Sequence, residues 1–298
     1  MRWWWRARVS MQNHTVYSSS RVNQLTSFLA WIAADRSRQS GLYFASDSRL
    51  TFDKTFRDDC VKLFCPSSSP EIFGMLGDDI AFPQVALPKI CAQIDAGLIP
   101  PGVATSMYGR IDWVLEQLIE MKASQPRSKN FTIFHGSRNQ YDIRSSFALT
   151  RHLYQGTSDT WIREDYDLTG DQSHALVFDG SGNEMVRSKL SPLTSLIGSV
   201  SRVHFEGFCN ALKAPCSDPK SGGAPQLLGL GSSGVGRHYG VQTKNGTFFQ
   251  GSPASFDSVP KGTQWRNETF EQVNAHGVQM KNRRRKLIKG KKRPPKEG

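Results

Sequence analysis

The sequence predicts an α+β fold in which two β-sheets pack face to face and helices flank them. Three observations support this prediction. Strand-like segments come in separate runs, two consecutive helical segments interrupt them, and a further helical segment comes later. Runs of strands separated by paired helices favour layered α+β packing over βαβ units with a parallel sheet. With 298 residues, the chain is long enough to bury one full core.

The first part of the structured region is predicted to be a hairpin followed by two short strands. TSFLAWIAA (26–34) is apolar and strand-like, DRSRQSG (35–41) is a polar turn, and GLYFASDSRLTF (41–52) is the second strand. DDCVKLFC (58–65) and EIFGMLGDD (71–79) are separated by the turn-forming segment PSSSP and add two more strands.

The hydrophobic period changes to that of a helix after Asp79. IAFPQVALPKICAQIDAG (80–97) has apolar residues roughly on one face and stops at Gly97, although Pro88 disfavours its start. SMYGRIDWVLEQLIEMKASQ (106–125) repeats apolar residues at helical spacing, so it is the clearest helix in the sequence.

The second half of the chain is predicted to return to strands, with one more helix among them. FTIFHG (131–136) is a strand, residues 138–172 are a variable region, and HALVFDGSGNEMVRSK (174–189) is a hairpin that turns on Gly180-Ser181-Gly182. RVHFEGFCNALKA (202–214) favours a helix. The segments QLLGLGS (226–232) and GVQTKNGTFFQG (240–251) supply the last strands, and the second of them turns on Asn245-Gly246.

Positive charge is concentrated at the two ends of the chain. The formal net charge is +12, yet residues 1–25 carry four arginines and no acid, and residues 281–298 carry ten Lys/Arg against one acid. The region between them is close to neutral, which argues against a folded surface shaped to hold a phosphate backbone. We therefore expect a flexible leader or propeptide at 1–24, one folded domain at 25–280 and a disordered basic tail at 281–298.

Cysteine usage and hydropathy indicate a cytoplasmic protein. The five cysteines are scattered without the paired spacings of a metal site or a small disulfide scaffold. No apolar run approaches the ~20 residues that span a bilayer, so we expect no membrane partner. The letters of a dinucleotide-binding motif occur at 229–234, but a strand rather than a helix is predicted to follow, so we expect no nucleotide there.

Six short segments resemble, in order and near spacing, the signature of proteasome β-type subunits and their bacterial relatives. They are LTSFLAW, FASDSRLTF, VKLF, FGMLGDD, LIGSVS and DPKSGGA, within residues 25–230. The resemblance implies the four-layer αββα sandwich of the N-terminal-nucleophile (Ntn) hydrolases. Carried over by position, it implies a set of seven site residues: Thr26, Asp47, Lys62, Gly77, Ser199, Asp218 and Ser221.

The chemistry implied by this resemblance uses a threonine at a new N-terminus. A threonine hydroxyl is a poor nucleophile until a base accepts its proton, and the α-amine, with a pKa of about 7.7–8.0, is a suitable base. The resemblance gives Lys62 and Asp47 the role of a charged pair that keeps the amine neutral, and Gly77 that of an oxyanion donor. It gives the two serines and Asp218 supporting hydrogen bonds.

The sequence thus predicts a threonine-type amide hydrolase, with a peptide or another amide as substrate and no metal or organic cofactor. Thr26 is internal and follows Leu25 where self-cleaving members of the family have glycine, so the chemistry requires removal of the leader. The resemblance also implies a homo-oligomer, such as a ring. The alternative is a catalytically inactive scaffold whose basic tail, 281–298, binds nucleic acid or an acidic protein.

Overall fold

The computed structural model describes residues 10–11, 26–35, 38–52, 55–126, 129–139, 146–170, 172–214, 219–274 and 278. The predicted tail at 281–298 lies outside these residues, as does the predicted leader at 1–24 apart from Ser10–Met11. The division of the chain into leader, domain and tail therefore stays a prediction.

One large sheet has six strands in the order β1-β10-β9-β8-β7-β6. All neighbouring pairs are antiparallel except β1 with β10, which is parallel. The strands are β1 (Ser10–Met11), β6 (Leu63–Phe64), β7 (Glu71–Gly77), β8 (Phe131–Arg138), β9 (Phe147–Gln155) and β10 (Thr160–Asp165).

The second large sheet has nine strands, of which seven follow the order β11-β2-β3-β12-β13-β14-β15, while β16 pairs with β13 and β17 with β16. These strands are β2 (Phe28–Asp35), β3 (Arg38–Ser46), β11 (His174–Asp179), β12 (Gln226–Gly231), β13 (Arg237–Thr243), β14 (Gly246–Phe249), β15 (Ser252–Pro253), β16 (Trp265–Asn267) and β17 (Gln272–Val273). A separate small hairpin joins β4 (Leu50–Phe52) to β5 (Thr55–Arg57).

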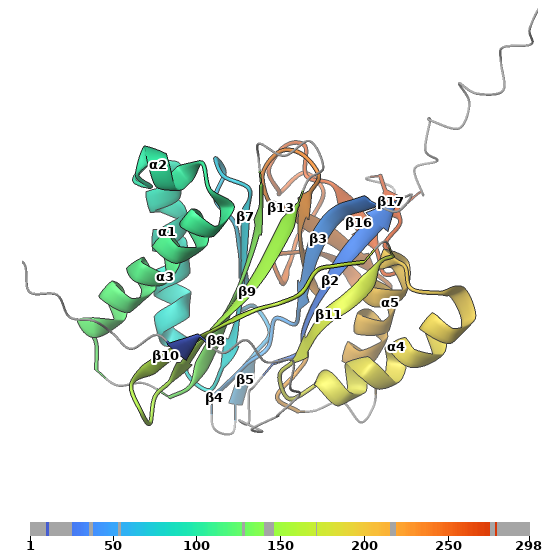
Figure 1. Cartoon of the computed structure of the whole chain (residues 1–298). Coiled ribbons are helices and arrows are strands. Elements are labelled where there is room, and N and C mark those ends of the chain that lie inside the picture. The colour runs from blue at the N-terminus through green and yellow to red at the C-terminus, as the bar shows by residue number, and fades with distance from the viewer. Residues whose placement is uncertain are drawn as a thin grey trace, which may run out of the picture.

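Helices pack on the outer faces of these sheets (Figure 1). The helices α1 (Ala81–Asp95) and α3 (Met107–Ala123) share a buried apolar cluster with β7 and β8. The short helix α2 (Pro101–Ala104) precedes α3, whose start is capped by the Ser106 hydroxyl accepting from Gly109 N–H. The helices α4 (Asn183–Ile197) and α5 (Ser201–Leu212) share another apolar cluster with β2, β3 and β12.

A third apolar cluster lies between the two sheets. It combines Phe28, Phe44 and Leu228 of the nine-stranded sheet with Ile72 and Phe134 of the six-stranded sheet. Phe28 and Phe134 stack with ring centroids 4.5 Å apart, and such pairs contribute about 0.5–1.5 kcal/mol beyond the apolar area that they bury. The start of β2 is therefore fixed against the opposite sheet, two residues after Thr26.

The expectation of a four-layer αββα sandwich is wrong as the fold class. The part of the chain that the structure describes is sheet-rich, with 36% of its residues in strands and 27% in helices, and large antiparallel sheets dominate its architecture. Strand content was underestimated because residues 138–172, expected to be a variable region, contain β9 and β10. Polar residues such as Arg151 and His152 interrupt the apolar period of β9 and so hide it in the sequence.

Most of the individual elements agree with the sequence. The hairpins β2–β3 and β13–β14 form as predicted, as do the helices α1, α3 and α5. The hairpin expected at 174–189 is wrong, because Gly180-Ser181-Gly182 joins strand β11 to helix α4 instead of a second strand. This difference places Ser181 at the end of a sheet, beside the start of β2.

Candidate active site

Four segments of the nine-stranded sheet meet at one end of the molecule. Thr26 lies two residues before the start of β2, and Asp47 follows the last residue of β3. Phe28 and Gln226 are both register partners of Ser46, and Asp179 at the end of β11 is the partner of Phe28. Antiparallel pairing therefore brings the start of β2, the end of β3, the start of β12 and the end of β11 together.

The fifth contribution comes from the opposite sheet. Lys62 directly precedes β6, and its carbonyl oxygen accepts a hydrogen bond from Met75 N–H of β7 at 3.0 Å. Its side chain crosses to the nine-stranded sheet, where Nζ lies 2.8 Å from Thr26 Oγ1 and 2.8 Å from Asp47 Oδ1. Thr26 and Asp47 are 0% exposed and Lys62 is 1% exposed. The structure thus brings together three of the seven residues that the sequence singles out.

The Asp47 carboxylate is held by several donors besides the lysine. Its Oδ1 also accepts from Ser27 N–H at 3.1 Å, and its Oδ2 accepts from Gly222 N–H at 3.0 Å and Arg49 N–H at 3.3 Å. Burying an ion pair is costly unless the remaining lone pairs are satisfied. These main-chain donors supply that compensation, so the carboxylate is a fixed anchor for the Lys62 ammonium.

The turn between β11 and α4 covers the main chain of Thr26. Ser181 Oγ accepts from Thr26 N–H at 3.3 Å, and Gly182 N–H donates to Thr26 O at 3.3 Å. Gly180 has φ +90°, and a Cβ there would lie 1.9 Å from Thr26 O. A Cβ at Gly182 would lie 1.9 Å from Ser27 Oγ. Only glycine fits at Gly180, because the near atom is main-chain and φ is positive, whereas a side chain at Gly182 would require the Ser27 hydroxyl to move.

Ser181 is a site residue that the sequence analysis missed. The resemblance pointed to the Gly198-Ser199 pair, but Ser199 lies between α4 and α5 and its Oγ bonds to His204 Nε2 at 3.2 Å. Gly180-Ser181 is the same dipeptide and directly follows a strand, which is the context that the signature requires. The strand before this dipeptide was predicted, but the turn was interpreted as a hairpin because the helix α4 that follows it was not recognised.

The remaining supporting residues have different positions. Ser221 Oγ lies 2.6 Å from Ser27 Oγ, so it contacts the residue after Thr26, and both side chains are buried. Asp218 lies outside the described residues. Its expected role stays a prediction.

Gly77 ends strand β7, at φ +147°. A Cβ there would lie 2.5 Å from Phe131 Cα, so close packing against β8 is one reason for glycine at this position. Gly77 follows Met75 by two residues, and Met75 bonds to Lys62. Its expected role as an oxyanion donor stays a prediction.

Cys60 lies close to this cluster in the sequence, and its thiol is less reactive than an exposed one. Cys60 is two residues before Lys62 and is 9% exposed. Burial raises the pKa of its thiol, against a smaller lowering effect of Lys62. The thiolate is the reactive form of cysteine, so a raised pKa makes this side chain less reactive at neutral pH.

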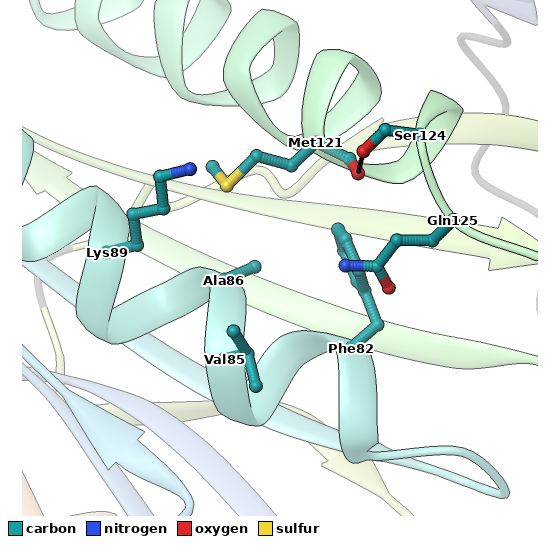
Figure 2. A pocket seen from close by; sticks show the side chains of 7 residues that line it. All are labelled: Phe82, Val85, Ala86, Lys89, Met121, Ser124 and Gln125. Carbon is teal, nitrogen blue, oxygen red and sulfur yellow. Dashed lines mark hydrogen bonds between the residues drawn. The ribbon is translucent and has the colours of Figure 1, made fainter.

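A small hollow elsewhere on the molecule does not belong to this cluster. Figure 2 shows it between α1 and α3, lined by side chains that include Phe82, Lys89 and Met121. Its volume is about 100 Å³. Pockets that enclose small-molecule ligands usually measure about 300–1,000 Å³. The hollow lies on the helix-covered face of the six-stranded sheet, whereas Thr26 lies at the end of the nine-stranded sheet.

In the part of the chain that the structure describes, no three His, Cys, Asp or Glu side chains form a group that could hold a metal ion. No helix there is long and apolar enough to cross a membrane. The expectation that the chemistry needs no metal or organic cofactor stays a prediction.

Comparisons with known proteins do not assign a family. No family model matches the sequence, and no curated protein matches it. In structure, the chain is similar to Anbu (ancestral beta-subunit) from Yersinia bercovieri, at 13% sequence identity and a TM-score of 0.48. The match covers 71% of this chain and 86% of that chain. At this TM-score the structural likeness supports no conclusion about the family. Because no family model and no curated protein matches the sequence, the sequence-based assignment to the proteasome β-type family is wrong on these findings.

Proposed function

We propose that this protein is an amide hydrolase, with peptides as the first substrate class to test, and that Thr26 is its nucleophile once the preceding residues are removed. The observation that carries this proposal is the position of Lys62 Nζ, which lies 2.8 Å from both Thr26 Oγ1 and Asp47 Oδ1. A buried ammonium that contacts a threonine hydroxyl stabilises negative charge on that oxygen, which is what a nucleophilic threonine requires.

The intact chain lacks the base that hydrolysis of a separate substrate needs. Thr26 N is part of a peptide bond and donates to Ser181 Oγ at 3.3 Å, so it has no basic lone pair. Removal of the leader is proposed to use Thr26 Oγ1 itself, which bonds to the Leu25 carbonyl carbon as the Leu25–Thr26 peptide bond breaks, passes its proton to the released nitrogen and leaves an ester that water hydrolyses. Cleavage before Thr26 converts the same nitrogen into an α-amine on the residue that carries the hydroxyl. The amine then accepts the hydroxyl proton, and the Lys62 ammonium beside it disfavours a second positive charge.

The proposed reaction has two stages. In the first, Thr26 Oγ1 forms a bond to the substrate carbonyl carbon while its proton moves to the α-amine, and the amine then returns that proton to the departing nitrogen. In the second, water hydrolyses the resulting ester with the same amine as base. A backbone N–H is needed for the oxyanion between these steps, and Gly77 N–H stays the predicted donor.

The first experiment is intact-mass spectrometry of the purified full-length chain beside three variants. A new N-terminus at Thr26 in the wild type, lost in Thr26→Ala and Lys62→Met, is the expected result. Thr26→Ser keeps a hydroxyl and should retain processing. Mass spectrometry reports on the nucleophile without a known substrate, and a cleaved sample can then be assayed on peptide and simple amide libraries.

Two matched controls separate loss of chemistry from loss of folding. Thr150→Ala removes another fully buried threonine hydroxyl, which bonds to Asp165. Lys122→Met removes another buried ammonium, which bonds to Pro126 O. Both controls should process normally. A folded wild type that stays intact, and shows no amide hydrolysis after its leader is removed by an added protease, would reject the proposal and favour the scaffold alternative.

Assembly, cellular location and the partners of the basic tail are separate predictions. A homo-oligomer is tested by the mass of the particle in solution. Binding of residues 281–298 to nucleic acid or to an acidic protein is tested by comparing the full chain with a version that ends at residue 280, at two salt concentrations.

A further inference from the structure

One buried amide side chain bonds to the main chain of both charged residues of the site. Gln226 is 1% exposed and is the first residue of β12. Its Oε1 accepts from Lys62 N–H at 3.1 Å, and its Nε2 donates to Asp47 O at 2.9 Å and to Cys60 O at 2.9 Å. A single side chain thus connects β12, the end of β3 and the segment that leads into β6.

These three bonds require a glutamine. The two carbonyl oxygens need a donor with two N–H groups, and the Lys62 N–H needs an acceptor on the same group. A neutral primary amide carries both, whereas an ionised carboxylate only accepts and an ammonium only donates. Gln226 therefore supplies hydrogen-bond partners to three buried main-chain groups. The described strands of the two sheets do not pair with each other at this point, so strand pairing does not supply these partners.

The position of this link matters because Lys62 and Thr26 belong to different sheets. β6 pairs with β7 in the six-stranded sheet, while Thr26 leads into β2 of the nine-stranded sheet. The Lys62 side chain has to cross between them to reach Thr26 Oγ1. A change in how the segment before β6 sits against β3 and β12 would move Nζ relative to both Thr26 and Asp47.

We infer that Gln226 is the positioning residue that holds the Lys62 ammonium on the Thr26 hydroxyl, by fixing the main chain of Lys62 and of Asp47. This inference rests on the proposed function and names a further residue on which it depends. Among the described residues Gln226 has no hydrogen bond to Thr26, so its effect on the reaction passes through Lys62. Displacing a catalytic group by about 1 Å costs about 100-fold in rate, so loss of the link should slow Thr26-dependent processing by about 10- to 100-fold.

The test compares Gln226→Met and Gln226→Glu with Ser48→Ala in the full-length chain. Methionine keeps the length of the side chain and removes its polar atoms. Ser48 is a matched control at the same end of the sheet, because its buried hydroxyl also joins main-chain groups, donating to Asp58 O and accepting from Ala224 N–H at 2.8 Å each. It has no hydrogen bond to Lys62 among those that the described residues show.

Rates of cleavage before Thr26 are measured by mass spectrometry under conditions in which every variant is folded. Gln226→Met should be about 10- to 100-fold slower than the wild type, and Ser48→Ala should stay within about twofold. Gln226→Glu gives a readout that a purely structural role would not. Its protonated acid can accept from Lys62 N–H and donate to one carbonyl, whereas its carboxylate repels both carbonyls. Its rate relative to wild type should therefore rise as the pH falls, while that of Gln226→Met stays level.

A crystal structure of Gln226→Met separates this inference from the proposed function. Supporting outcomes are a Lys62 Nζ displaced from Thr26 Oγ1, together with slower processing wherever the wild type processes. A wild type that never processes, and hydrolyses no amide after an added protease removes its leader, would reject the proposed function alone, and the crystallographic separation would then decide the inference. A folded Gln226→Met with Nζ unmoved, or with wild-type processing rates, would overturn it.

Discussion

The Lys62–Asp47 pair offers a test at the scale of single residues. Removing one partner of a buried ion pair usually costs about 3–5 kcal/mol, because the other charge is left unpaired. Lys62→Met should therefore lower the free energy of unfolding by about that amount. The double variant Lys62→Met with Asp47→Asn removes both charges, so it should recover part of the loss while remaining unprocessed. Urea unfolding and intact mass measure the two effects.

This design distinguishes charge from shape. Asn keeps the outline of the Asp47 side chain and one oxygen for the Ser27 or Gly222 N–H. If the double variant were as unstable as the sum of the two single variants, then the unpaired charge would not be the cause of the loss. The importance of the lysine would in that case lie in its packing.

The choice between two serines is a second test at this scale. Ser181 Oγ accepts from Thr26 N–H, whereas Ser199 bonds to His204. One hydrogen bond is worth about 0.5–1.5 kcal/mol, which corresponds to a rate loss of up to about tenfold. Ser181→Ala should therefore slow processing by up to about tenfold, and Ser199→Ala should leave it near the wild-type rate. Equal effects of the two changes would remove Ser181 from the site.

At the scale of elements, the turn from β11 to α4 should tolerate no side chain at Gly180. Alanine there would meet Thr26 O at 1.9 Å and would also strain a backbone at φ +90°. Gly198 is a matched control, because its φ is +84° but an added Cβ would meet nothing within 4 Å. Gly198→Ala should cost about 1–3 kcal/mol from strain alone. Gly180→Ala should cost more and also stop processing.

Thermal unfolding and intact mass measure this pair of variants. The comparison is informative because both glycines lie at the ends of α4, one before it and one after it. If both variants lost the same stability and processed alike, the close approach of the turn to Thr26 would have no functional consequence.

The same turn illustrates what the sequence predicts and what it does not. Alternation of apolar residues and an Asn-Gly turn are local signals, so β2–β3 and β13–β14 were predicted correctly. Gly-Ser-Gly is equally suited to a hairpin and to a strand-to-helix turn. The polar start of α4 and its Pro192 concealed the helix that distinguishes them. The serine beside Thr26 was consequently assigned to the wrong Gly-Ser pair.

Some site residues were likewise predicted from the sequence, and one was not. Thr26, Asp47 and Lys62 were predicted because the short segments that contain them resemble the proteasome β-type signature, and the structure places the three side chains in contact. Gln226 gave no signal, because a glutamine at the start of an apolar strand looks like an ordinary boundary residue. Its role depends on three main-chain contacts from segments about 160 to 180 positions away. Such contacts follow only from the pairing of the strands.

At the scale of the whole molecule, buried neutral histidines should make the fold sensitive to mild acid. His152 is 0% exposed, and neither of its ring nitrogens has a hydrogen-bond partner among the described residues. Burial lowers its pKa well below the ordinary value, and nearby His135 and Arg163 add to this effect. Burial also lowers the pKa of His204 to about 4, with a contribution from His174.

The sign of the pH effect follows from these directions. The unfolded chain protonates its histidines near pH 6.5, whereas His152 and His204 stay neutral in the folded chain. Below about pH 6.5 the unfolded state therefore binds more protons, and the free energy of unfolding falls as the pH falls. By pH 5 each histidine should remove about 2 kcal/mol. Burial raises the pKa of Asp179, which gives an opposing slope in the acidic range.

Urea unfolding of the full chain at pH 7.5, 6 and 5 tests this prediction, with His152→Phe as the informative variant. Phenylalanine fills a similar volume with no titratable group, so the variant should lose less stability between pH 7.5 and 5 than the wild type does. The difference between the two curves isolates His152, because Asp179 and every carboxylate remain in both proteins. Parallel curves would show that His152 is protonated equally in the folded and unfolded chains.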